Sequence, residues 1–113
     1  MARARPAPRR PRGRREPIMR VVADLCIVPM GVGPSVSPYV REIKALIDAS
    51  PLEAEMHANG TNIEGELADI CQLIERCEAR LAELGVQRVF YTMTFGTRRD
   101  KAQSMADKLR AVS

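Results

Sequence analysis

The chain has 113 residues, a net charge of +4, 45% hydrophobic residues and only four aromatic side chains, none of them Trp. This length allows one domain with a modest, mainly aliphatic core. No apolar run approaches the ~20 residues that cross a bilayer, which excludes a membrane-spanning protein. The positive charge belongs to one end, because residues 1–17 contain seven Arg and one Glu, and the remaining residues carry a net charge of −2.

Residues 1–17 combine these arginines with four prolines and lack any hydrophobic period. We expect this Arg/Pro-rich tail to be disordered, because it cannot bury enough apolar surface to offset its ordering entropy. One interpretation is an arm for nucleic acid or another acidic surface. We favour the interpretation that this tail is an extension without a role. The first predicted strand begins with a methionine, Met19, as expected if the true start site lies there and the tail comes from a start site read too early. The folded domain is expected at residues 18–113.

Residues 19–29 alternate between two faces that are both largely apolar, a pattern typical of a central strand covered on both sides. A domain of this size has helices for only one face of a sheet. We therefore expect a second copy of the chain to cover the other. The next loop, residues 29–34, contains a Gly-x-Gly but no third glycine, so a dinucleotide-binding fingerprint is excluded.

Ser37 as N-cap and Pro38 as first helical residue predict a helix that ends at Ser50-Pro51. Residues 52–58 then alternate apolar and polar side chains, which predicts a half-buried strand. Asn59-Gly60 predicts a type I′ turn, because that turn requires positive φ at both central residues. The turn would pair residues 52–58 with residues 61–65 as a hairpin.

Residues 66–84 carry an apolar stripe at helical spacing, and Gly85 should end this second helix. Residues 88–96 are the last predicted strand, and residues 97–112 a closing helix. The three cysteines all lie on apolar stripes, as buried free thiols do, and none belongs to a Cys-x-x-Cys pair. We therefore expect neither a disulfide framework nor a zinc site, which favours a reducing cytosol.

The predicted order is βαββαβ plus a closing helix, which indicates an α+β, ferredoxin-like sandwich with an antiparallel sheet. The name describes topology only, since no iron–sulfur ligand set is present. The alternation places a group of polar side chains on the sheet face away from the helices: Asp24, Glu55, His57, Asn62, Glu64, Thr92 and Thr94.

This polar face admits several functions. Asp24, Glu55 and His57 could form a metal site, or perform acid–base catalysis in a small enzyme. However, no nucleophile stands beside an activating base in the sequence, so we expect that the protein is not an enzyme. Amides and carboxylates also suit a small polar or cationic heterocycle. The remaining alternative is an oligomeric scaffold without a ligand.

Two segments carry a family likeness: His57–Glu66, with Gly60-Thr61-x-x-Glu64-Gly65, and Phe95–Lys101, with Gly96-Thr97-Arg98. Together they resemble the small thiamine-binding family of ferredoxin-like proteins, formerly an uncharacterised protein family. The likeness extends from Met19 to Val112 and excludes the tail.

The resemblance implies a cytosolic homo-oligomer, a dimer or tetramer, that binds thiamine or a related aminopyrimidine without catalysis. It implies no metal and no cofactor beyond that ligand. One departure concerns the second helix, where the family's Cys-His pair is matched here by Cys77-Glu78. A role that depends on this histidine is therefore not carried over.

The resemblance also suggests residues for the ligand. Asn62 and Glu64 are expected to bind the aminopyrimidine, whose ring nitrogens and exocyclic amine suit an amide and a carboxylate. The hydroxyethyl end of the ligand would lie against three hydroxyl side chains, Thr61, Thr92 and Thr94.

Met30 and Phe90 would contact the ligand rings, and a thiazolium over Phe90 would form a cation–π pair. The alternative is that both residues pack between subunits. Arg98 is a candidate phosphate contact, because Gly96-Thr97-Arg98 would place backbone amides and a guanidinium at a helix N-terminus.

Overall fold

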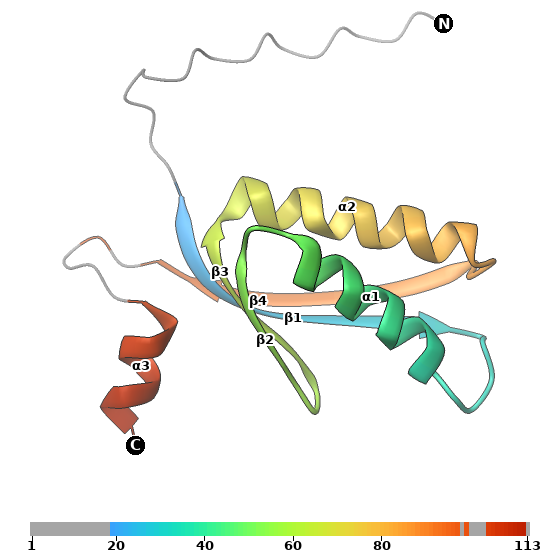
Figure 1. Ribbon diagram of the computed structural model, residues 1–113, viewed down its shortest axis with the longest axis horizontal. Helices are drawn as coiled ribbons and strands as arrows, with labels where there is room; N and C mark the ends of the chain where they lie inside the picture. Colours follow the sequence, from blue (N-terminus) through green and yellow to red (C-terminus); the bar gives the residue numbers. More distant parts are fainter. Residues whose placement is uncertain (1–18, 98, 100–103, 113) are drawn as a thin grey trace, which may run out of the picture.

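The computed structural model describes residues 19–97, 99 and 104–112, so the Arg/Pro-rich tail and Arg98 lie outside it. Its elements are β1 (Arg20–Met30), α1 (Ser37–Ala49), β2 (Glu53–His57), β3 (Gly60–Glu66), α2 (Leu67–Glu83), β4 (Arg88–Gly96) and α3 (Met105–Val112) (Figure 1). The predicted α+β fold, βαββαβ with a C-terminal helix, is confirmed. Within the described ranges, no helix has the length and apolar character needed to cross a membrane.

β1 is the centre of the sheet, whose strand order is β2-β3-β1-β4 with every neighbouring pair antiparallel. It pairs with β3 from Arg20 to Leu25, and with β4 from Val22 to Met30. Residues 26–30 of β1 therefore have a neighbouring strand on one side only.

The helices α1 and α2 lie on the same face of the sheet, and α3 stands clear of them (Figure 1). The side chains between this face and the two helices form an aliphatic core with one thiol: Val21, Ala23, Leu25, Ile43, Ile47, Ile63, Ile70, Leu73, Cys77, Leu81 and Val86. The opposite face, here called the open face, carries exposed side chains such as Asp24 and Phe90. The structure is thus a two-layer sandwich.

The β2–β3 hairpin forms as predicted, but its turn does not. His57 pairs with Gly60, so the two loop residues are Ala58 and Asn59 rather than Asn59 and Gly60. Among the described residues only glycines have positive φ, and Gly60 is not one of them. The prediction of a type I′ turn was therefore wrong, and Gly60 is required for a different reason, given below.

The helix ends differ slightly from those expected. Val36 is the N-cap of α1, without a side-chain cap bond, and Ser37 is already helical. Pro38 follows within the first turn, where its missing N–H costs nothing. Gly85 follows α2 with φ of 85°, which is a conformation that glycine adopts readily. Cys71, expected on the apolar stripe of α2, is exposed.

α3 begins at Met105, so the prediction of a helix from Thr97 placed its start too early. Ser104 and Asp107 form a capping box: the Ser104 hydroxyl accepts from the Asp107 N–H at 3.1 Å, and the Asp107 carboxylate accepts from the Ser104 N–H at 3.0 Å. These bonds, with that from Arg110, lower the pKa of Asp107. A Ser-x-x-Asp spacing was the signal for this start.

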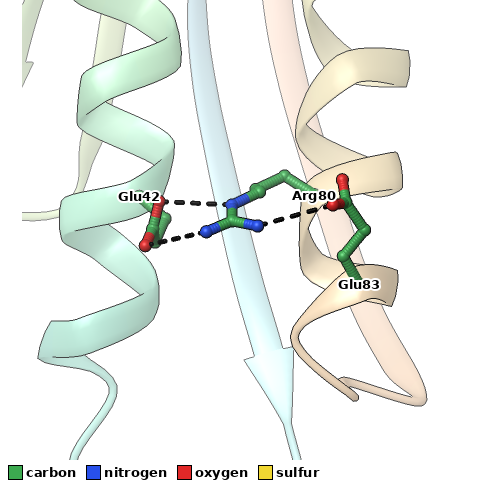
Figure 2. Close-up of polar contacts among 3 residues, drawn as sticks. All are labelled: Glu42, Arg80 and Glu83. Carbon is green, nitrogen blue, oxygen red and sulfur yellow. Dashed lines mark hydrogen bonds and ion pairs between the residues drawn. The ribbon is translucent and has the colours of Figure 1, made fainter.

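α1 and α2 are joined on their outer side by Arg80. Figure 2 shows its guanidinium between Glu42 of α1 and Glu83 of α2. Nε lies 3.3 Å and Nη2 3.2 Å from the two Glu42 oxygens, and Nη1 lies 3.5 Å from Glu83. Hydrogen bonding to Glu42 and its charge raise the pKa of Arg80. A two-pronged contact of this kind fixes the relative position of two helices better than a single bond does.

We predict that Arg80→Met lowers stability through loss of this contact, because methionine keeps an apolar stem but not the charge. Denaturant unfolding of Arg80→Met, Glu42→Gln and the double variant should reveal a coupling energy that shrinks at high salt. Lys44→Met is the matched control, since it removes a pair with Asp48 inside α1 and leaves the helix–helix contact intact. Additive effects of Arg80→Met and Glu42→Gln would contradict the prediction.

We also predict an alkaline loss of stability caused by Cys77, whose burial raises the thiol pKa from 9.0 to about 11. The folded state holds this proton more tightly, so the stabilisation is complete below pH 9 and is lost as pH rises to about 11. This rise in the pKa corresponds to about 2–3 kcal/mol of folding free energy at most. In urea unfolding, the free energy of unfolding of Cys77→Ala should therefore fall less steeply between pH 9 and about 11 than that of the wild type.

The wild-type protein is the reference in this comparison. Tyr91, whose pKa is raised by burial and by its hydrogen bond to Glu78, contributes to the slope in both proteins. Identical slopes would show that Cys77 does not titrate in this range.

Candidate functional site

A row of polar residues crosses the open face. Glu55 of β2 pairs with Asn62 of β3, Asn62 with Asp24 of β1, and Asp24 with Thr94 of β4. Directly paired residues point to the same face, and neighbouring strands lie about 4.8 Å apart. One carboxylate, one amide and one hydroxyl therefore stand side by side within roughly 10 Å at Asp24, Asn62 and Thr94.

A hollow of about 270 Å³ lies over this row, and we call it the open-face hollow. It is lined by Asp24, Asn62 and Thr94, together with the less polar residues Val22, Ala23, Phe95 and Gly96. A Cβ at Gly96 would meet nothing within 4 Å, so the missing side chain leaves this end of the hollow open. The hollow therefore combines hydrogen-bonding groups with a negative charge.

Glu64 lies in the next row, between Glu53 of β2 and Val22 of β1. Its side chain is only 5% exposed, and its carboxylate lies 3.7 Å from Nη2 of Arg20. A buried carboxylate depends on a nearby positive charge, because its hydration is lost. Glu64 therefore has a partner within the chain and does not line the open-face hollow, although it was expected to bind the ligand beside Asn62.

The only histidine of the chain bridges two strands. His57 Nε2 lies 2.9 Å from Oδ1 of Asp24, and Nδ1 accepts a hydrogen bond from the Asn59 N–H at 3.2 Å. Because Nδ1 is the acceptor, these bonds assign the donating hydrogen to Nε2. Both ring nitrogens are thus engaged, and we call this contact the His57–Asp24 bridge.

Gly60 makes the His57–Asp24 bridge possible. A Cβ at this position would lie 2.9 Å from the Asp24 carboxylate, 2.9 Å from the Leu25 carbonyl oxygen and 3.3 Å from the His57 ring. The first two distances are shorter than real Cβ contacts, so any larger residue would displace β1 or the bridge. Close approach, and not a special backbone conformation, is the reason for glycine here.

The metal and acid–base hypotheses required Asp24, Glu55 and His57 together. The structure brings Asp24 and His57 together but makes their contact an internal bond with both imidazole nitrogens used. Within residues 19–97, 99 and 104–112, no three His, Cys, Asp or Glu side chains are grouped closely enough to hold a metal ion. A third ligand for this pair is therefore missing from the described part of the chain.

The other expected contact residues lie apart from the open-face hollow. Thr61 is 4% exposed and pairs with Leu25 and Met56, so it lies on the face that the helices cover. Phe90 stands four residues before Thr94 on β4, roughly 14 Å away.

Two further residues expected to contact the ligand, Thr92 of β4 and Met30 of β1, lie near Phe90. Thr92 lies between Phe90 and the hollow and pairs with Cys26, and Met30 pairs with Arg88 beyond Phe90. Asn62 and Thr94 thus share one site, whereas Met30 and Phe90 belong to another part of the open face.

Four residues that line the hollow were not among the expected site residues: Val22, Ala23, Phe95 and Gly96. Phe95 pairs with the core residue Ala23, and its side chain was expected on the face that the helices cover, yet it is 43% exposed and is among the residues that line the open-face hollow. It stands near the end of an edge strand, where no further strand holds its side chain in place. Gly96 also lines the hollow, and its pairing with Val22 is not readable without the register.

Comparisons with known proteins agree with this architecture. The profile of a family described as thiamine-binding protein matches residues 23–113. A UPF0045 protein of Synechocystis sp. is 40% identical over 99 residues, covering 88% of this chain and 82% of the relative. The crystal structure of a hypothetical protein from Methanocaldococcus jannaschii is similar with a TM-score of 0.76 and 32% identity, covering 84% of this chain and 97% of that one.

A further similar structure comes from Thermotoga maritima, from a protein provisionally named for thiamine biosynthesis or salvage. Its TM-score is 0.68 at 16% identity, covering 83% of this chain and 99% of that one, a likeness that speaks for the fold alone. The profile match includes all of the open-face hollow except Val22. The chain therefore belongs to the thiamine-binding protein family, also designated UPF0045.

Proposed function

We propose that this protein binds thiamine or a related aminopyrimidine in the open-face hollow, and that it does so without catalysing a reaction. The observation that carries the proposal is the row of Asp24, Asn62 and Thr94 beneath this hollow. Family membership supports the choice of ligand, because the family is described as thiamine-binding.

The chemistry of the ligand matches that row. An aminopyrimidine offers ring-nitrogen acceptors and an amine donor, which an amide such as Asn62 can pair with in both directions. Thiamine also carries a positive thiazolium, which the Asp24 carboxylate would attract. Thr94 offers a hydroxyl to the hydroxyethyl end, as the sequence suggested.

A second copy of the chain would complete the site. The open-face hollow is shallow, and the same face continues into an apolar strip of Val28, Met30 and Phe90, which are 41%, 43% and 61% exposed. Contiguous exposed apolar side chains mark interaction surfaces. A homo-oligomer packed through this strip would bury it and would also wall the hollow.

Two observations support a binding rather than a catalytic role. The His57 ring, the obvious general base, has both nitrogens in hydrogen bonds within the chain. The cysteines are unpaired, and the buried one, Cys77, has a raised pKa, which disfavours a thiolate nucleophile. Free thiols also agree with action in the reducing cytoplasm.

The ligand assignment predicts a loss of thiamine affinity in Asn62→Ala. Removing the amide leaves the pyrimidine edge without its partner, which should weaken binding by about tenfold in calorimetric titrations with thiamine. Hydroxymethylpyrimidine, which contains only the ring that Asn62 would bind, should lose affinity to the same extent.

Gln72→Ala is the matched control, because it removes an exposed amide from α2, far from the open face. It should leave the affinity unchanged. Equal thiamine affinities of Asn62→Ala and wild type would contradict the proposed site. Absence of thiamine binding by the wild type would favour the alternative of an oligomeric scaffold without a ligand.

The assembly proposal predicts that Phe90→Lys shifts the protein to smaller species in sedimentation experiments. A lysine at this position would place a charge in the middle of a buried apolar contact, where it loses hydration without compensation. Val112→Lys is the control, since Val112 is 83% exposed on α3 and lies outside the strip. A wild-type monomer, or an unchanged assembly in Phe90→Lys, would contradict the proposed interface.

A further inference from the structure

A second cavity, of about 390 Å³, lies between the tip of the β2–β3 hairpin, β1 and α1. We call it the hairpin cavity. It exists because β1 is longer than its partner: the last β1–β3 pair is Leu25 with Thr61, and β1 continues with β4 alone. Figure 1 shows β1 and β4 running on together past the hairpin and beneath α1. Its volume falls within the ~300–1,000 Å³ typical of small-molecule sites.

The walls of the hairpin cavity are largely apolar. Side chains from three elements contribute: Leu25 and Ile27 of β1, Val40 and Ile43 of α1, and Met56 of β2. His57 is the only lining residue of a basic or acidic type, and its Nε2 is bonded to Asp24. A charged molecule would lose its hydration here without gaining an opposite charge. The cavity therefore favours uncharged groups over ions.

Polar groups meet this apolar space at two places. The Thr61 side chain is 4% exposed and lines the cavity, and its hydroxyl has no hydrogen-bond partner among the described residues. The second place is the bare edge of β1 at residues 26–30, where alternate residues turn their backbone groups toward the missing strand. A donor and an acceptor are thus available beside a flat apolar wall.

We propose that the hairpin cavity is a second binding site, for a small, planar, uncharged heterocycle with a neighbouring donor and acceptor, such as a cyclic amide. The apolar walls would hold the ring, and the Thr61 hydroxyl with the β1 edge would pair with its polar side. This site is separate from the open-face hollow and does not depend on thiamine binding there.

Titration with 2-pyridone, a neutral planar cyclic amide, tests the proposal by amide NMR. We expect shifts at millimolar concentration that centre on Val40, Ile43 and Thr61, and no such shifts with N-methylpyridinium, a cation of the same size. Absence of 2-pyridone shifts at these residues would overturn the proposal. Equal binding of the cation, or shifts centred on Asn62 and Thr94, would also overturn it.

Substitutions then separate the two sites. Thr61→Val keeps the shape of the side chain but removes the hydroxyl, so it should weaken 2-pyridone binding on the order of three- to tenfold, the effect of one neutral hydrogen bond. Thr94→Val is the matched control in the open-face hollow and should leave 2-pyridone affinity unchanged.

A Val40→Phe variant, which fills the hairpin cavity, should abolish 2-pyridone binding while the protein still unfolds cooperatively. Thiamine affinity of this variant reports on the open-face hollow separately, so failure at one site is distinguishable from failure at the other. Unchanged 2-pyridone affinity in both Thr61→Val and Val40→Phe would overturn the proposal.

Discussion

The unequal pairing of β1 is the constraint on which the rest of the structure depends. β1 is held by β3 over its first six residues and by β4 over its last nine, so it passes through the centre of the sheet and then beyond it. The shared part supplies Val21, Ala23 and Leu25 to the core. The unshared part leaves a bare edge beneath α1, and this difference in length creates the hairpin cavity.

The His57–Asp24 bridge ties the hairpin to the shared part of β1. It adds to the strand ladder that ends at Leu25, to the Arg20–Glu64 ion pair and to the core packing of Ile63. The bridge spans β3 at Gly60, the one position on its path where a side chain is lacking. A polar contact on the open face therefore stabilises the same hairpin whose other face belongs to the core.

Much of this architecture is readable from the sequence, because alternation and turn residues act locally. The alternation along residues 20–30 and 60–66 places Asp24 and Asn62 on the open face, as found. The role of Gly60 is not readable in this way, since Asn59-Gly60 indicates a turn type whereas the structure uses Gly60 for close approach.

The burial of Glu64 beside Arg20 and the exposure of Phe95 depend on where the sheet and helices end. Local patterns do not encode those boundaries. The same limit applies to the site of Thr61, which shares a motif with Asn62 but lies on the other face.

One consequence of the bridge concerns communication through the sheet. Asp24 borders the open-face hollow and His57 borders the hairpin cavity. A single hydrogen bond of 2.9 Å therefore connects a residue of one space with a residue of the other. A ligand in the hairpin cavity that displaced the His57 ring would also act on the Asp24 carboxylate in the open-face hollow. Thermodynamic linkage makes such an influence equal in both directions, so occupants of the two spaces would sense each other without any change of fold.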